Sequence, residues 1–225
     1  MFDVDAWTGE LIDRLRGALG ENLLFVGLQG SYLRGEATEQ SDLDIMCALE
    51  RVDMDSLGTY RRVLAAMPDQ GQACGFICSR EDLANWPRYE LLTLERGTRP
   101  LYGRLAPLLP SYTRQDIRRG VAIGAANLYH ESCHRYLYGA QGVEGLRGAY
   151  KAAFYVLQQA VYLREGVYVS TRRALADRLA GEERALLTAF DQWEAQRAER
   201  QARPEAWFGR MIHWCQRMLR ESSEK

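Results

Sequence analysis

Two aspartates and a glycine–serine pair form the stretch of the sequence with the clearest chemistry. Asp42 and Asp44 lie two residues apart at the start of an apolar run, and Gly30 and Ser31 end an earlier apolar run. Side chains two apart in a strand point to the same face, so the carboxylates would lie together. Such neighbours repel unless a cation separates them or one keeps its proton. Because oxygen donors suit Mg²⁺, the pair predicts a magnesium site.

The residues around Gly30 have the chemistry of a phosphate-binding turn. Without a Cβ, Gly30 lets backbone N–H groups approach a phosphate, and the Ser31 hydroxyl is a further donor. Arg34 could neutralise phosphate charge, and Ser41 directly precedes the aspartates, so both are candidate nucleotide-binding residues. A polar hairpin with two solvated aspartates is the alternative. The combined pattern, set between two apolar runs, favours the binding site.

The same residues carry a family resemblance. Residues 30–35 read G-S-Y-L-R-G and residues 41–45 read S-D-L-D-I. The pattern resembles the signature of polymerase-β-type nucleotidyltransferases, especially small bacterial members such as the minimal and the antibiotic (aminoglycoside and lincosamide) nucleotidyltransferases. The resemblance implies that Gly30 and Ser31 bind the triphosphate and that Asp42 and Asp44 bind the metal. Such enzymes transfer a nucleoside monophosphate from an NTP to a hydroxyl and release pyrophosphate.

Short apolar runs and helical spacing predict the elements that would position this site. Apolar runs bounded by turn residues indicate strands, and apolar residues three and four apart indicate amphipathic helices. Pro107 and Pro110 mark a change from a mixed pattern to an all-helical one, so we expect a domain boundary near residue 108. The expected strands are 23–28, 45–49, 72–78 and, at a sheet edge, 99–103; the helices are 3–19, 53–67, one from Arg80 and a segment at 89–94.

The sequence therefore predicts an α+β nucleotidyltransferase domain with a mixed sheet at 1–108 and an all-α bundle at 109–225. The layout of the second domain resembles the helical domains that accompany small nucleotidyltransferases, including the HEPN type. Its expected helices are 112–140, 144–165, 171–197 with a break near Gly181, and 204–222.

One expected feature of the family is missing. The superfamily usually places a third carboxylate on the third strand, but residues 72–78 contain none. The nearest acids are Asp69, Glu81 and Asp82, and the last two fit better as first-turn acids of the helix from Arg80. A nucleotide-binding or partner-binding relative without turnover, such as a toxin–antitoxin-like module, is therefore the alternative to an active enzyme.

Residues 130–134 read H-E-S-C-H, which matches the zinc-protease pattern H-E-x-x-H. His130 and His134 would share a helix face, which makes a zinc hydrolase a distant alternative; ordinary core or interface histidines are the simpler explanation. In some antibiotic nucleotidyltransferases a carboxylate of the helical domain deprotonates the acceptor hydroxyl. Glu131 is our candidate for that base.

Lys151 is unusual because the chain contains 27 arginines and only one other lysine, Lys225. A compact ammonium among arginines could be selected for contact with a phosphate, so Lys151 is a candidate nucleotide-binding residue. Chance is the competing explanation, since two lysines must lie somewhere.

Composition excludes several classes of protein. The chain of 225 residues is 47% hydrophobic and 26% charged, with a net charge of −1 that gives no general attraction to nucleic acid. No apolar stretch approaches the roughly 20 residues that span a bilayer, and the five scattered cysteines do not suggest a disulfide framework. We expect a cytoplasmic enzyme without a membrane partner that binds Mg²⁺ and an NTP, most simply ATP as the donor of AMP. Its hydroxyl-bearing acceptor would be a small molecule, such as an aminoglycoside-like antibiotic, or a protein, and the enzyme could form a homodimer.

Overall fold

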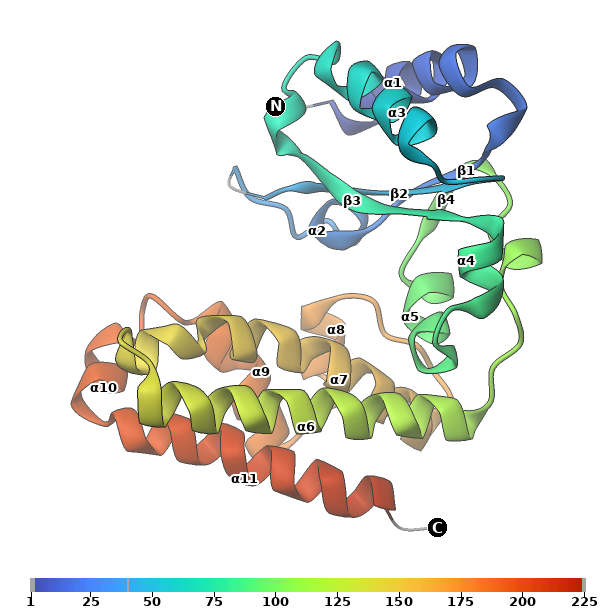
Figure 1. Cartoon of the computed structure of the whole chain (residues 1–225). Helices are drawn as coiled ribbons and strands as arrows, with labels where there is room; N and C mark the ends of the chain where they lie inside the picture. The colour runs from blue at the N-terminus through green and yellow to red at the C-terminus, as the bar shows by residue number, and fades with distance from the viewer. Residues whose placement is uncertain (1–2, 40, 224–225) are drawn as a thin grey trace. The chain divides into compact units, whose positions relative to one another are not determined.

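The computed structural model describes residues 3–39 and 41–223 (Figure 1). The chain divides into two compact units, Met1–Ser111 and Tyr112–Lys225. The first unit is a mixed sheet with helices and the second is built from helices, which confirms the predicted fold class.

The first unit contains a four-stranded sheet in the order β3-β2-β1-β4. β1 pairs antiparallel with β2 and with β4, whereas β2 and β3 run parallel. All four predicted strands are confirmed, with β4 at one edge and β3 at the other. Their bounds are β1 Leu23–Leu28, β2 Leu43–Leu49, β3 Ala73–Ser79 and β4 Arg99–Gly103.

Two long helices, α1 (Val4–Leu19) and α3 (Met54–Ala65), cover one face of this sheet (Figure 1). Asp3 caps α1, and Asp53 forms a capping box with Ser56 at the start of α3. The apolar stripe of α1, with Trp7, Leu11 and Leu15, is buried against the inward side chains of β1 and β2. These contacts form the larger core of the unit.

Shorter elements lie on the other face of the sheet. They are α2 (Gly30–Arg34), α4 (Arg80–Asn85), α5 (Leu91–Arg96) and a 3₁₀ turn at Ala106–Leu108. A second, smaller core joins Phe25, Met46 and Cys78 of the sheet to Leu83 of α4. Asp82 is an acid in the first turn of α4, as expected, and it also forms a capping box with Ser79.

The second unit is organised around α6 (Arg114–Tyr138), which packs against α7 (Arg147–Glu165) and α11 (Pro204–Ser223). The helical segment predicted over 171–197 is broken near Gly181, as expected, and its second helix ends at Asp191. It is divided into α8 (Arg172–Ala176) and α9 (Gly181–Asp191), and α10 (Arg197–Ala202) begins only after a turn. Thr171 caps α8, and Gly181, with a φ of 52°, marks the predicted break.

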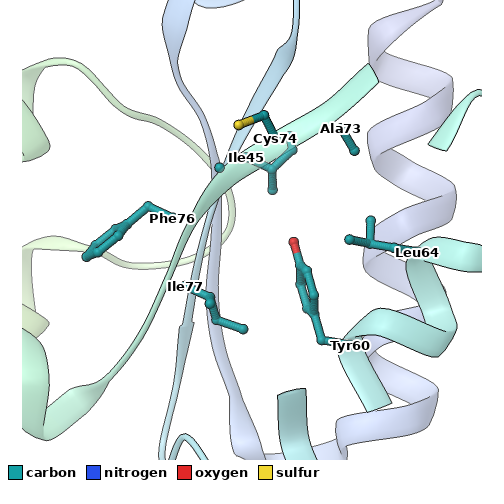
Figure 2. A pocket seen from close by; sticks show the side chains of 8 residues that line it. Ile45, Tyr60, Leu64, Ala73, Cys74, Phe76 and Ile77 are labelled. Atoms are coloured by element: carbon teal, nitrogen blue, oxygen red, sulfur yellow. The ribbon is translucent and has the colours of Figure 1, made fainter. Parts of the chain in front are cut away.

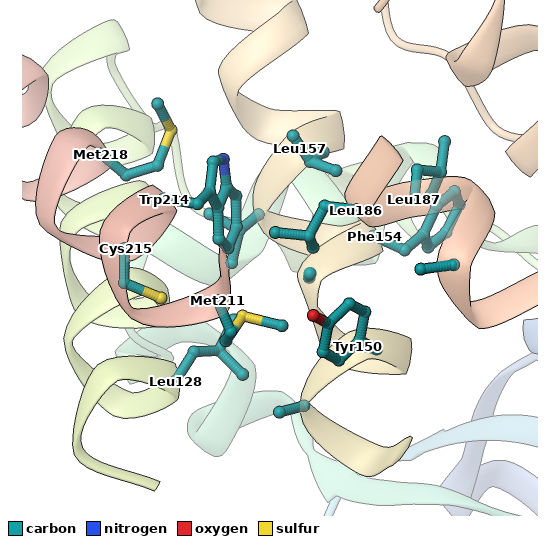
Figure 3. Close-up of a cluster of buried hydrophobic side chains, with 14 of the residues drawn as sticks. Leu128, Tyr150, Phe154, Leu157, Leu186, Leu187, Met211, Trp214, Cys215 and Met218 are labelled. Carbon is teal, nitrogen blue, oxygen red and sulfur yellow. The ribbon is translucent and has the colours of Figure 1, made fainter. Parts of the chain in front are cut away.

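The core of the helical unit is rich in aromatic side chains. Tyr150 of α7 is fully buried and donates a hydrogen bond of 2.9 Å to the Trp207 carbonyl of α11. Figure 3 shows Leu128 of α6 and Tyr150 of α7 near Met211 of α11, and Phe154 of α7 beside Leu187 of α9; all belong to one buried cluster. In the part of the chain that the structure describes, no helix is both long and apolar enough to cross a membrane.

Candidate active site

The end of β1 and the start of β2 bring the predicted binding residues together. Leu28 pairs with Ile45, and the Gln29 N–H donates a hydrogen bond of 2.8 Å to the Asp44 carbonyl. The chain then enters α2 directly at Gly30 and Ser31. The Gly-Ser pair and Asp44 are therefore neighbours, as the sequence pattern implied.

Gly30 is required here for a reason that the sequence did not reveal. Its φ is +68°, a conformation that side chains disfavour. A Cβ on Gly30 would lie 1.7 Å from Oδ2 of Asp44. The glycine thus makes room for the aspartate carboxylate, in addition to any room it leaves for a phosphate.

Asp42 and Asp44 lie at the start of β2. Asp42 lies directly before the strand and is exposed, and Asp44 is partly exposed. Leu43 and Ile45, which alternate with them, are buried in the core on one face of the sheet. The period of two predicts that the two acidic side chains share the opposite face.

The side chains of the site provide only part of the ligands that a Mg²⁺ ion needs. Within residues 3–39 and 41–223, no group of three or more His, Cys, Asp or Glu side chains is close enough to hold a metal. Two carboxylate oxygens fit Mg²⁺, which commonly takes one or two carboxylates together with substrate phosphates and water. Asp42 and Asp44 would hold the ion, and nucleotide oxygens would complete its coordination.

The strand register shows which residue of β3 lies beside Asp44. Cys74 of β3 pairs with Asp44 of β2, so the two side chains lie on adjacent strands on the same face. Cys74 is exposed. The sequence showed that the strand lacks an acid, but it did not identify Cys74 as the neighbour of Asp44.

None of the nearby acids replaces that carboxylate. Hydrogen bonds from the Ser79 hydroxyl and N–H hold the pKa of Asp82 below its usual range, because its carboxylate accepts both. Glu81 is exposed in the first turn of α4, and Asp69 lies in the turn before β3 with a φ of 50°.

Arg34 and Ser41 lie close to the site in sequence but also have structural partners. The Arg34 guanidinium Nε donates a hydrogen bond of 2.9 Å to Glu36, and both side chains are largely buried. The Ser41 hydroxyl accepts a hydrogen bond of 2.9 Å from the Thr38 N–H and closes the turn that leads into Asp42. A phosphate-binding role for either residue would be additional to these roles.

The remaining candidates belong to the helical unit. Glu131 lies on α6, where its carboxylate accepts a hydrogen bond of 2.8 Å from Nε of Arg135. Lys151 is exposed on α7. His130 and His134 are exposed on α6, which excludes a core position for them and leaves the expected interface role a prediction.

A pocket of about 200 Å³ lies beside the edge strand β3 (Figure 2). The Tyr60 ring of α3 extends into it, and burial raises the pKa of the Tyr60 hydroxyl. Two neighbours of Asp44 line the pocket. Ile45 follows Asp44 in β2, and Cys74 pairs with Asp44 on β3. The remaining lining residues are Leu64, Ala73, Gly75, Phe76 and Ile77.

Comparison with known proteins assigns a class to this arrangement. Residues 12–95, which include α2 and strands β1 to β3, match the family described as "Nucleotidyltransferase domain". This stretch lies within the first unit, contains the candidate site and is similar to nucleotidyltransferase domains, which belong to a class of enzymes. No curated protein sequence is similar enough to count as a match.

A solved structure with a similar fold is that of spectinomycin adenyltransferase AAD(9) from Enterococcus faecialis, determined with ATP and spectinomycin. It is 15% identical to this chain, with a TM-score of 0.57, and the match covers 97% of this chain and 100% of that one. At this identity the likeness concerns the fold, and it extends over both units.

Proposed function

We propose that this protein transfers a nucleoside monophosphate, most simply AMP from ATP, to a hydroxyl group of a small molecule. The observation that carries the proposal is the close packing of Gly30, at the start of the Gly-Ser turn, against the carboxylate of Asp44, with Asp42 directly before the same strand. The nucleotidyltransferase match of residues 12–95 supports the reaction class. A similar fold has been determined with ATP and spectinomycin, which supports ATP and an aminoglycoside-like antibiotic as the first substrates to test.

The residues of the chain would divide the work as follows. The backbone N–H groups at the start of α2 and the Ser31 hydroxyl bind the triphosphate. The first backbone N–H groups of a helix have no hydrogen-bond acceptor within the helix, so they can donate to an anion. Asp42 and Asp44 would hold a divalent ion beside the triphosphate. When bound, Mg²⁺ would supply charge neutralisation for the phosphates and the leaving pyrophosphate. The acceptor hydroxyl would then be held in line with the α-phosphorus.

Pyrophosphate release tests the proposal directly. The full-length protein is incubated with Mg²⁺, each NTP and a panel of hydroxylated acceptors, including aminoglycosides and a protein acceptor. We expect acceptor-dependent release that is lost, by at least about 100-fold, in Asp44→Asn. Equal release by the wild type and Asp44→Asn would overturn the assignment of the site.

Cys74 offers a native probe of nucleotide binding that does not depend on turnover. It is the exposed cysteine among the described residues, whereas Cys47, Cys78 and Cys215 are buried and burial raises the pKa of each thiol to about 12. Alkylating reagents should therefore modify Cys74 first. Mg²⁺ with ATP should slow this modification, while partly exposed Cys133 in the helical unit serves as the internal control.

A second candidate is a nucleotide-binding relative with weak or absent turnover, such as a toxin–antitoxin-like module. It is favoured by one observation: the neighbour of Asp44 on β3 is the thiol of Cys74 and not a carboxylate. Calorimetry with ATP and Mg²⁺, followed by the release assay, separates the two. Binding without release for any acceptor would support the second candidate.

Several finer features stay predictions from the sequence. They are the HEPN-type character of the helical unit, the homodimer, the cytoplasmic location, and the roles of Arg34, Ser41, Glu131 and Lys151.

A further inference from the structure

The outward face of α6 carries an unusual set of side chains. Val121, Ala125 and Leu128 of this helix are buried in the core of the helical unit. The opposite face is exposed; Leu137 and Tyr138, for example, are 64% and 74% exposed. We call this face the histidine stripe: Asn127, His130, His134, Leu137 and Tyr138, all of which are exposed.

The two histidines of the stripe are placed side by side. They are four residues apart, which puts them on consecutive turns of one helix face. Their ring centroids are 6.2 Å apart. Two imidazoles that bind one tetrahedral ion at about 2.0–2.1 Å from each nitrogen have ring centroids roughly 5 Å apart. The observed separation is about 1 Å longer, so both side chains must turn toward each other to reach one ion.

Both imidazoles are available for a ligand. Among the described residues, neither His130 nor His134 takes part in a hydrogen bond or an ion pair; their contacts are with each other and, for His134, with the Tyr138 ring at 5.2 Å. The helix beneath them is held rigid because its other face packs against α7 and α11. A rigid backbone reduces the entropy lost when two ligands converge on one ion.

We propose that His130 and His134 form a second metal site, selective for a borderline divalent ion such as Zn²⁺, Ni²⁺ or Cu²⁺, with water in the remaining positions. Imidazole nitrogens favour these ions, whereas Mg²⁺ favours oxygen ligands, so the site is chemically distinct from the Asp42–Asp44 pair. It does not depend on the proposed nucleotide transfer.

The site binds metal without being a zinc hydrolase. In H-E-x-x-H enzymes the glutamate acts as a base on metal-bound water. Here the Glu131 carboxylate is paired with Arg135 on the same helix at 2.8 Å. Catalytic zinc sites have three protein ligands, and among the described residues no group of three His, Cys, Asp or Glu side chains could hold a metal. The sequence match therefore describes a pair of ligands and not a hydrolytic centre.

Titration calorimetry of the untagged full-length protein with Ni²⁺ and with Zn²⁺ tests the proposal. We expect one ion per chain, with affinity reduced by about tenfold or more in His130→Ala and in His134→Ala. His213, the third histidine, is exposed on α11 and gives the matched control, because His213→Ala should bind as the wild type does. Glu131→Gln should also keep its metal affinity.

A thermal-unfolding measurement provides a second readout. Zn²⁺ should raise the unfolding temperature of the wild type and of His213→Ala, because an ion that binds only the folded state stabilises it. It should not do so for the double variant His130→Ala/His134→Ala, whose helical circular dichroism should match that of the wild type. Metal binding that persists in the double variant, or that falls equally in His213→Ala, would show the proposal to be wrong.

Discussion

Gly30 lies so close to the Asp44 carboxylate that a single added carbon atom, the Cβ of any other residue, would displace it. Two glycines flank the short helix α2, Gly30 at its start and Gly35 at its end, and their φ values are +68° and +67°. A Cβ on Gly30 would collide with Asp44, whereas a Cβ on Gly35 would have nothing within 4 Å. The two positions therefore share the backbone strain but not the collision.

This difference gives a matched pair of variants. Gly35→Ala should cost about 1–2 kcal/mol of stability through φ alone and keep most of its activity. Gly30→Ala should carry the same strain and also displace Asp44, and a misplacement of about 1 Å can reduce turnover by about 100-fold. Pyrophosphate release and chemical unfolding of both variants check this. Equal activity losses would contradict the role of the collision.

The thiol of Cys74 allows a gain-of-function prediction. Because Cys74 is the strand neighbour of Asp44, Cys74→Glu should place a third carboxylate at the site. We expect tighter Mg²⁺ binding and, for an enzyme limited by its metal site, pyrophosphate release that is faster by about tenfold.

The control is Cys74→Ser, which changes the atom without adding charge. It should behave as the wild type does in both assays. If Cys74→Glu binds Mg²⁺ no more tightly than Cys74→Ser, then Cys74 does not occupy the position of the missing ligand.

At the scale of elements, a buried ion pair joins distant parts of the helical unit. Arg200 of α10 is fully buried, and its guanidinium donates hydrogen bonds of 2.8–3.2 Å to Glu144, which lies in a 3₁₀ turn before α7. The same guanidinium lies 4.0 Å from the centroid of the Trp193 ring. These hydrogen bonds hold the pKa of Glu144 below its usual range.

Glu144→Gln should therefore lower the free energy of unfolding at pH 7. A hydrogen-bonded buried pair can lose 3–5 kcal/mol when broken, but Glu144 is 36% exposed, so we expect about 2 kcal/mol. Glu194→Gln is the control, because its partner Arg197 is exposed and surface pairs contribute about 0–1 kcal/mol.

The same pair predicts a pH dependence. Since the folded-state pKa of Glu144 is lowered, its contribution is complete above the ordinary value of 4.5 and is lost as the pH falls through the lowered folded pKa. The stability difference between the wild type and Glu144→Gln should thus shrink below about pH 4.5. Urea unfolding at several pH values measures it, and a difference that grows on acidification would contradict the assignment.

At the scale of the whole molecule, the question is what the helical unit contributes to transfer. Lys151 and Glu131 are its two candidates, and each has a conservative variant. Lys151→Arg should weaken ATP binding by about tenfold if a compact ammonium contacts phosphate, whereas Arg147→Lys, on the same helix, should leave it unchanged.

Glu131 is predicted to act on the acceptor and not on the nucleotide. Glu131→Gln should reduce turnover by about 100-fold or more while ATP binding stays at the wild-type level, because general bases typically contribute 10²–10⁴-fold. Turnover that survives in Glu131→Gln removes this residue from the mechanism. Arg135→Gln is the control, because it breaks the ion pair with Glu131 but keeps the Glu131 carboxylate. If turnover falls because the base is lost, Arg135→Gln should keep its activity; if it falls because the ion pair is lost, both variants should lose activity.

Much of this protein was determined by local sequence. Residues 99–103 were expected as an edge strand and form β4, and Asp53 begins a helix as its capping position suggested, because strand periodicity and capping depend on a few neighbouring residues. The shared face of Asp42 and Asp44 follows from the same period of two.

Tertiary structure alone decided which distant residues became neighbours. The pairing of Cys74 with Asp44 depends on the register of two strands joined through α3, and the collision at Gly30 depends on how α2 packs on β2. The histidines of α6 were ambiguous in sequence because both sides of that helix carry apolar residues. Only packing against α7 and α11 determined which side is buried and left His130 and His134 exposed on the other.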